Sequence, residues 1–268
     1  MNNMKNYLEV AEFAAIESGK ILMKFYQNVK FINKKGEGGN LVTEADELAE
    51  KKILEIITKE FPDHKILSEE SGYNNIKDSD YLWAIDPLDG TTNYSHGYPI
   101  FAVSIALLKD KKPIIGVVNV PFMNALYKAE VGKGATLNNK EICVTNSTEL
   151  TESLLVTGFP YDRAIIEDNN YREYQHLSNL THGVRRSGSA AFDLVSVASG
   201  KIDGFWENSL NLWDISAGWL IVKEAGGKVT GLDSEEIKMQ NIGLIASNKT
   251  IHKELSNELK FIRNYVNF

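Results

Sequence analysis

Two aspartates, Asp86 and Asp89, close an apolar run in the stretch AIDPLDGTTNYSHGYP at 84–99. Pro87 lies between them, and because it has no N–H and a fixed φ it stiffens the turn. The two carboxylates can then face the same side, and the carbonyl of Leu88 can serve as a third oxygen ligand for a metal ion. Taken alone, the same turn is also explained by carboxylates that bond the local backbone.

The next three residues are Gly90, Thr91 and Thr92. Successive N–H groups and a hydroxyl at such a turn are a common way to bind a phosphate. An anionic phosphate can approach a cluster of carboxylates only when cations lie between them. A metal-binding turn that leads directly into a phosphate-binding turn therefore predicts metal-assisted phosphate chemistry.

Further acids stand at predicted strand ends or helix starts: Asp46, Glu69, Glu70 and Asp214. Oxygen ligands without His or Cys favour Mg²⁺, Mn²⁺ or Ca²⁺ over zinc. Each acid also has a structural interpretation, since Asp46 and Asp214 suit the first turn of a helix and the two glutamates suit a solvated turn. Together with the 84–99 stretch they favour one shared cleft.

Apolar periodicity predicts the elements that position these acids. Helices are expected over 4–26 and from Thr43 to just before Pro62. Later helices are expected at 169–180, 189–198 and 214–224 and at the C-terminal end. Strands are expected at 64–72, 81–90, 100–108, 114–121, 127–142, 153–158, 183–188, 203–207 and 243–247. Consecutive strands make the first part α+β, and alternating strands and helices make the second part α/β.

We expect two packed lobes that meet near residue 145. The N-terminal lobe, 1–145, carries most of the predicted metal ligands and the phosphate-binding turn. The C-terminal lobe, 146–268, carries Asp214 and the residues on the substrate side.

The composition excludes some classes of protein. The 268 residues carry a formal net charge of -7, so nothing supplies the dense basic surface that nucleic acid requires. Glu9, Glu12 and Glu17 interrupt the N-terminal apolar positions, which argues against a signal peptide or a membrane span and predicts a cytoplasmic protein. The single cysteine, Cys143, excludes an intrachain disulfide.

Two longer motifs carry a resemblance to a known family. DPLDGTTN resembles the first signature of the inositol monophosphatase family, and WDISAGWLIVKEAGG at 213–227 resembles the second. SEESG at 68–72 and LVTEAD at 41–46 follow the family's order with similar spacing. The resemblance extends from Lys35 to the C-terminal helix. It implies a layered αβαβα sandwich of the sugar-phosphatase type, usually a homodimer, with a lithium-sensitive, magnesium-dependent site.

The resemblance also implies roles for individual residues. The implied metal ligands are Glu69, Asp86, the Leu88 carbonyl, Asp89 and Asp214. Lys35, Asp46 and Thr91 would lie by the water nucleophile, and Asp46 and Thr91 would orient it. The implied phosphate and substrate contacts are Gly90, Thr91, Thr92, Gly188, Ser189, Ala190 and Glu207, next to the ligand Asp214. The departures from the family pattern, Ser68 and Ser216, do not fall on a ligand.

The predicted activity is hydrolysis of a phosphate monoester, in the first place inositol 1-phosphate, by a metal-activated water. Two or three Mg²⁺ ions are expected per site, with Mn²⁺ as a substitute. NADP(H) 2′-phosphate, 3′-phosphoadenosine 5′-phosphate and fructose 1,6-bisphosphate remain alternative substrates. Two other classes stay open: a glycosidase with Asp86 and Asp89 as its acid pair, and an inactive, metal-binding regulatory protein. No nucleic-acid or membrane partner is expected.

Overall fold

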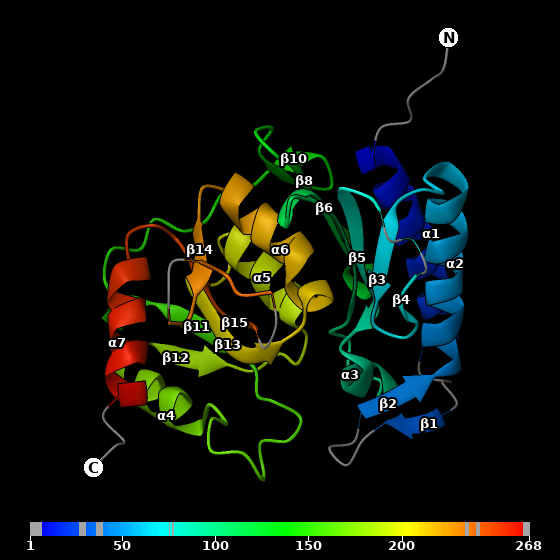
Figure 1. Ribbon diagram of the computed structural model, residues 1–268. Helices are drawn as coiled ribbons and strands as arrows, with labels where there is room; N and C mark the ends of the chain where they lie inside the picture. The colour runs from blue at the N-terminus through cyan, green and yellow to red at the C-terminus, as the bar shows by residue number, and fades with distance from the viewer. Residues whose placement is uncertain are drawn as a thin grey trace.

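The protein is described by a computed structural model that covers residues 7–26, 31–35, 40–74, 76, 78–233, 236–239 and 242–264. For 31–35 and 40–43 it describes the backbone alone. Helices and sheets alternate in five layers, αβαβα, as Figure 1 shows. The layered sandwich expected from the sequence is confirmed.

The first sheet has eight strands in the order β10-β9-β8-β7-β6-β5-β3-β4. They are β3 (Lys65–Ser68), β4 (Gly72–Tyr73), β5 (Tyr81–Asp89), β6 (Ala102–Lys109), β7 (Lys112–Val120), β8 (Ala125–Glu130), β9 (Ala135–Leu137) and β10 (Lys140–Glu141). All neighbours pair antiparallel except β3 and β5, which are parallel. Its central strands are apolar on both faces, because helices cover both sides.

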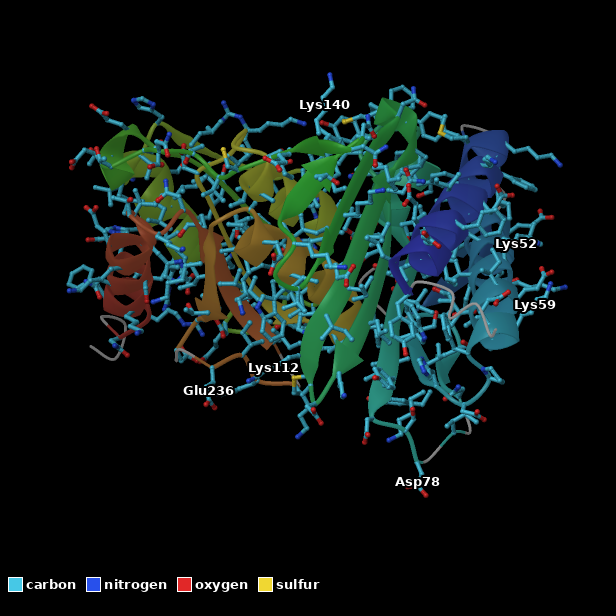
Figure 2. All side chains as sticks on the ribbon, turned by 90° about the horizontal axis from the view of Figure 1, so that it is seen from above. Lys52, Lys59, Asp78, Lys112, Lys140 and Glu236 are labelled. Atoms are coloured by element: carbon cyan, nitrogen blue, oxygen red, sulfur yellow. The ribbon has the colours of Figure 1, made fainter. Side chains whose placement is uncertain are left out.

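The outer face of this sheet packs against α1 (Tyr7–Phe25) and α2 (Glu44–Glu60). Trp83, Ile85 and Ile105 point to this side, and the charged side chains of α2, among them Lys52 and Lys59, point away from the sheet (Figure 2). A short hairpin of β1 (Phe31–Lys35) and β2 (Asn40–Thr43) leads into α2.

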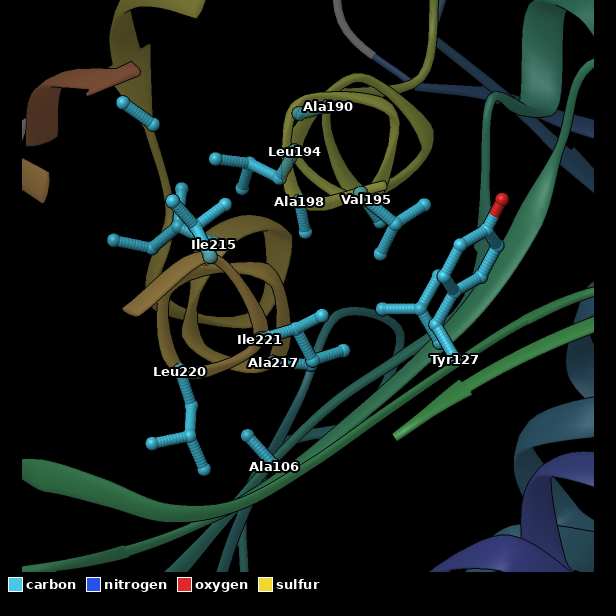
Figure 3. Packing of buried hydrophobic residues seen from close by; sticks show 14 of the residues in the cluster. Ala106, Tyr127, Ala190, Leu194, Val195, Ala198, Ile215, Ala217, Leu220 and Ile221 are labelled. Atoms are coloured by element: carbon cyan, nitrogen blue, oxygen red, sulfur yellow. The ribbon is translucent and has the colours of Figure 1, made fainter. Parts of the chain in front are cut away.

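The central layer consists of α5 (Ala190–Ala198) and α6 (Leu212–Glu224), which lie between the two sheets. In Figure 3, Ala217 and Leu220 of α6 lie on the side toward Ala106 of β6. The helices approach their neighbours closely at glycines: a Cβ on Gly116 of β7 would lie 2.7 Å from the Ala217 carbonyl oxygen. This one core cluster therefore joins residues from both predicted lobes.

The second sheet has five strands in the order β12-β11-β13-β15-β14. They are β11 (Leu154–Thr157), β12 (Gly183–Arg185), β13 (Gly204–Leu210), β14 (Lys228–Gly231) and β15 (Ile242–Ser247). The strands β12, β11 and β13 are parallel, and β15 pairs antiparallel with both β13 and β14. Its outer face is covered by α4 (Tyr171–Leu180) and α7 (His252–Asn264).

Most predicted elements are present, with small differences in their bounds. The last helix of the central layer begins at Leu212 rather than Asp214, because Asn211 is its N-cap and Asp214 occupies the third helical position. The strand β14 was not predicted. Two 3-10 turns (Pro121–Met123 and Leu150–Glu152) and the short helix α3 (Thr91–Ser95) complete the described elements. No helix in the described ranges is long and apolar enough to cross a membrane.

Candidate active site

A pocket opens where the end of β5 and the start of α3 meet β13 and the first turns of α5 and α6. The predicted site residues that line it are Glu69, Asp86, Leu88, Asp89, Gly90, Thr91, Thr92, Gly188, Ser189, Ala190, Glu207 and Asp214. They come from stretches more than a hundred residues apart in the chain. The fold therefore brings together most of the residues that residue type, spacing and the family resemblance predicted for the site.

A bulge in β5 aims the two aspartates of the DPLD stretch. Asp86 faces Ser104 across the ladder and Asp89 faces Ala102, so three steps on β5 match two on β6. Such an insertion bends the strand, and a proline is tolerated there because it need not donate to the ladder. Pro87 therefore lies where the strand turns its acids toward the pocket.

The turn also contains local hydrogen bonds of the kind expected if its carboxylates have only a structural role. The Leu88 N–H donates to Asp86 Oδ1 at 2.9 Å, and the Thr91 hydroxyl donates to the Leu88 carbonyl at 3.0 Å. A carbonyl oxygen has two lone pairs, so that of Leu88 keeps capacity for a second partner. The structural and the ligand interpretations are compatible.

Gly90 adopts the left-handed conformation, with φ 92°, where β5 becomes α3. A side chain at this position would be strained, and its Cβ would lie 3.0 Å from the Ile100 carbonyl oxygen. Thr91 is buried and Thr92 is exposed at the start of the helix. Glycine is thus required for the chain to turn at the pocket.

Asp89 joins the turn to the first turn of α5. Its Oδ2 accepts hydrogen bonds from the Ser189 hydroxyl at 2.6 Å and from the Ala191 N–H at 2.7 Å. Ser189 is also the N-cap of α5 and accepts from the Phe192 N–H at 3.2 Å. Burial raises the pKa of Asp89 to about 6, although these hydrogen bonds oppose the shift.

Asp214 enters the pocket from the first turn of α6. Its Oδ2 accepts from the Asn211 N–H at 2.7 Å, which is one half of a capping box. Burial, followed by repulsion from Glu69 and Asp89, raises the pKa of Asp214 well above its usual range. The capping bond thus fixes the position of the Asp214 carboxylate, although a negative charge is energetically unfavourable there.

The same electrostatics apply to Asp86, whose pKa is also raised well above the usual range. Burial is the largest cause, and repulsion from Glu69, Asp89, Asp214 and Asp46 adds to it. Oxygen donors that repel one another in a partly buried pocket are the donor set that a hard divalent cation needs.

Arg186 is the only basic side chain among the described residues that line the pocket. Its charge lowers the pKa values of Glu207 and Asp193, against the larger raising effect of burial. The acids of the β5 turn and of α6 have no such cationic neighbour in the pocket lining. This donor set fits the metal dependence that the sequence predicts.

The carboxylates do not, however, form a finished coordination shell. Within the described ranges, no three His, Cys, Asp or Glu side chains are grouped so that they could hold one ion. Like charges repel, so carboxylates converge on a point only around a cation. The structure gathers the donors in one pocket, and the ligand assignment stays a prediction.

Of the described candidate acids, Asp46 and Glu70 are not among the residues that line the pocket. Asp46 is buried in the first turn of α2, behind the turn of β5, where its charge adds to the raised pKa of Asp86. Lys35 is the last residue of β1, and its side chain lies outside the described residues.

Several residues that line the pocket were not predicted, among them Gly158, Tyr161, Arg186 and Asp193. Gly158 and Tyr161 follow β11 directly, and loops at strand ends often carry binding residues, so their position offered a signal. Asp193 lies in the first turn of α5, four residues after Ser189, and its carboxylate accepts a hydrogen bond from the Ser187 hydroxyl. By residue type and position alone, Asp193 does not differ from an ordinary first-turn acid.

The chain is similar to known proteins over nearly its full length. Residues 3–263 match the model of the inositol monophosphatase family. An inositol-1-monophosphatase from a Synechocystis species is 48% identical over 258 residues, which cover 96% of this chain and 90% of the relative. A fructose-1,6-bisphosphatase/inositol-1-monophosphatase from Aquifex aeolicus is 42% identical, with 94% of each chain covered. The protein named Nus factor SuhB from Haemophilus influenzae is 39% identical, with 96% of this chain and 97% of the relative covered.

Solved structures agree with the sequence comparison. The inositol monophosphatase from an Anabaena (Nostoc) species superposes with a TM-score of 0.89 at 47% identity, and the match covers 97% of this chain and 98% of the other. The Thermotoga maritima inositol monophosphatase gives a TM-score of 0.87 at 33% identity, with 97% and 99% covered. The chain belongs to the inositol monophosphatase family of phosphatases.

Proposed function

We propose that the protein hydrolyses inositol 1-phosphate in a Mg²⁺-dependent reaction. One observation carries the proposal: the acids Glu69, Asp86, Asp89 and Asp214 reach a single pocket that continues into the Gly90–Thr92 turn. The pocket thus offers a cation-binding part and a phosphate-binding part side by side. Only a substrate that bears a phosphate uses both parts.

In this proposal Mg²⁺ is held by the four carboxylates and the Leu88 carbonyl. When bound, the ions supply a Lewis acid that lowers the pKa of water and offsets the charge of the phosphoryl oxygens. The residues of the chain do the positioning. The Thr91 hydroxyl, fixed by its bond to Leu88, accepts a hydrogen bond from the attacking water, and Asp46 supports this orientation with its negative charge.

The remaining pocket residues hold the substrate. The N–H groups of the Gly90–Thr92 turn donate to the phosphate, and such preset donors contribute most where negative charge increases in the transition state. Glu207 accepts hydrogen bonds from hydroxyls of the alcohol. Gly188, Ser189 and Ala190 form the neighbouring wall at the start of α5.

The choice of inositol 1-phosphate rests on the polar character of the alcohol side. Glu207 and Asp193 provide acceptors there, which suits an alcohol with several hydroxyl donors. The name of the Aquifex aeolicus relative favours fructose 1,6-bisphosphate as a second candidate, and Arg186 in the pocket lining is a group that could meet its second phosphate.

Other features follow from the same family membership as proposals. Two or three Mg²⁺ ions act per site, Mn²⁺ substitutes for them, and Li⁺ inhibits. We propose a cytoplasmic homodimer without nucleic-acid or membrane partners.

The test compares initial rates on inositol 1-phosphate, fructose 1,6-bisphosphate, NADP⁺ and 3′-phosphoadenosine 5′-phosphate, with Mg²⁺ and with EDTA. We expect the highest kcat/KM on inositol 1-phosphate, and no turnover in EDTA. Asp89→Asn should lower kcat by about 100-fold or more. Asp78→Asn, at an exposed aspartate that does not line the pocket, is the matched control and should leave kcat unchanged.

Each other outcome has a distinct meaning. Full activity in EDTA, or in Asp89→Asn, contradicts the metal assignment. A different preferred ester corrects the substrate alone. A folded protein that binds Mg²⁺ but hydrolyses none of the four esters supports the regulatory alternative.

A further inference from the structure

A loop at the pocket has no role in the reaction described so far. Residues 158–170, here called the mouth loop, connect β11 to α4, and the four residues 158–161 line the pocket. In Figure 1 the segment that precedes α4 extends below the second sheet. Tyr161 is 56% exposed there and presents a large amphipathic side chain at the edge of the site.

The mouth loop is fastened at its base. Asn170 donates to the Gly158 carbonyl at 2.7 Å, and Trp206 of β13 donates to Asn170 Oδ1 at 2.7 Å. Asn170 and Trp206 are both buried. The first and last residues of the loop are therefore held together against the second sheet.

A second contact holds the returning half of the loop. Arg263 of α7 binds Asp168 with both terminal nitrogens, at 2.9 and 2.8 Å. Asn208 of β13 donates to the Asp168 carbonyl at 2.8 Å. A bidentate pair fixes orientation as well as distance, so the loop presents Tyr161 from a fixed base.

The loop also touches the substrate side of the pocket directly. Thr157 pairs with Trp206 in the parallel ladder, so the next residues on each strand, Gly158 and Glu207, lie side by side. A Cβ on Gly158 would lie 2.1 Å from Glu207 Oε1. Tyr161 therefore lies three residues after Gly158, which packs on Glu207, the predicted acceptor for substrate hydroxyls.

The surroundings of Tyr161 are rich in acceptors. Burial of part of the side chain, together with the charges of Glu69, Asp89 and Asp214, raises the pKa of Tyr161, which keeps the phenol protonated at neutral pH. No described residue is hydrogen-bonded to its hydroxyl. This side chain thus adds a donor and an apolar ring to a pocket whose lining includes six carboxylates.

On the basis of the proposed function, we propose that Tyr161 is a specificity-determining residue for the alcohol part of the substrate. Its hydroxyl donates to a ring hydroxyl of a polyol phosphate, while Glu207 accepts from another, and its aromatic ring covers part of the polyol. The two residues together recognise a hydroxylated leaving group.

The experiment compares two substrates on Tyr161→Phe. Inositol 1-phosphate carries the hydroxyls, and 4-nitrophenyl phosphate carries none. Loss of one neutral hydrogen bond should raise KM for inositol 1-phosphate about 3- to 10-fold. The kcat/KM for 4-nitrophenyl phosphate should stay within about 2-fold of the wild type.

Tyr171→Phe is the matched control. Tyr171 begins α4 at the other end of the mouth loop, packs against Phe159 with ring centroids 4.9 Å apart, and does not line the pocket. Tyr171→Phe removes the same hydroxyl oxygen as Tyr161→Phe, but from a residue outside the pocket lining. The kcat/KM values for both substrates should therefore be unchanged. Equal melting temperatures of the three proteins show that the loop is intact.

Four results would overturn the proposal. Unchanged kinetics of Tyr161→Phe on both substrates show that the hydroxyl is not used, and an equal loss on both substrates shows a general role rather than specificity. A wild type that hydrolyses neither ester refutes the proposed function and the role of Tyr161 with it. A wild type that hydrolyses 4-nitrophenyl phosphate but not inositol 1-phosphate refutes the substrate assignment before any variant is measured.

Discussion

Magnesium binding should be coupled to the proton on Asp89. The carboxyl is partly buried, and its pKa is raised from 3.8 to about 6, with burial as the largest cause. The perturbation is the addition of Mg²⁺ to metal-free protein at a series of pH values from about 4.5 to about 7.5. The quantity measured is the free energy of unfolding from urea titrations followed by circular dichroism.

The sign follows from the two pKa values. As the pH rises above 3.8 the unfolded chain loses this proton first, while the folded protein keeps it until about pH 6. In that window the folded state binds more protons, so the free energy of unfolding falls as the pH rises. The shift from 3.8 to about 6 is about 2.2 units, which corresponds to about 3 kcal/mol. Asp86 and Asp214, whose pKa values are also raised, add to the same trend.

Mg²⁺ requires ionised carboxylates, so it should stabilise the protein little at about pH 5 and strongly at about pH 7.5. Asp89→Asn removes the titrating proton and keeps an oxygen for the Ser189 and Ala191 donors. The metal-free variant should therefore lack this part of the pH dependence. At about pH 7.5 it should be as stable as the wild type or more stable, by up to about 3 kcal/mol.

Asp78→Asn controls for the general effect of losing one negative charge, because Asp78 is exposed. The reasoning is refuted if the metal-free wild type and Asp89→Asn show the same pH dependence of stability. It is also refuted if Mg²⁺ stabilises the wild type equally at both ends of the pH range.

Substitutions at two further positions separate structural from functional roles. Gly158→Ala places a Cβ 2.1 Å from Glu207 Oε1, and the flexible glutamate should move away, so the fold should survive while KM for inositol 1-phosphate rises several-fold in steady-state kinetics. Asp214→Asn keeps an acceptor for the Asn211 N–H and should lose Mg²⁺ affinity in calorimetry with little loss of stability, whereas Asp214→Ala should lose about 1 kcal/mol more in urea titrations. Equal stability of the two Asp214 variants would contradict the capping role.

The order of the elements along the chain was predictable because their apolar patterns are strong. The strands β5, β6 and β7 are apolar on both faces, and this pattern is typical of a sheet covered by helices on both sides. Strand order and direction were not predictable, since pairing depends on contacts between distant segments. The strand β14 has only four residues and no clear alternation of apolar and polar residues, and it forms by pairing with β15. The boundary near residue 145 stays a prediction.

The candidate site was predictable where its residues cluster in sequence. Asp86, Asp89 and the Gly90 turn lie within five residues, so type and spacing carried the inference. Tyr161 and Asp193 were missed because each is an ordinary residue for its local element, a loop tyrosine and a first-turn acid. Only the packing of the mouth loop and of α5 against the pocket gives them a place in the site.

The sequence left a choice between structural and ligand roles for each acid, but the two roles depend on one another. Asp89 joins the β5 turn to α5, and Asp214 caps α6, so each helix start fixes the position of one carboxylate. Burial is the largest cause of the raised pKa of Asp214, and repulsion from Glu69 and Asp89 adds to it, whereas the hydrogen bond from the Asn211 N–H lowers that pKa. The capping bond therefore helps to hold an ionised carboxylate at the point where a cation is needed. Alanine substitutions remove the cap and the charge together, whereas amide substitutions remove the charge and keep an acceptor for the capping N–H.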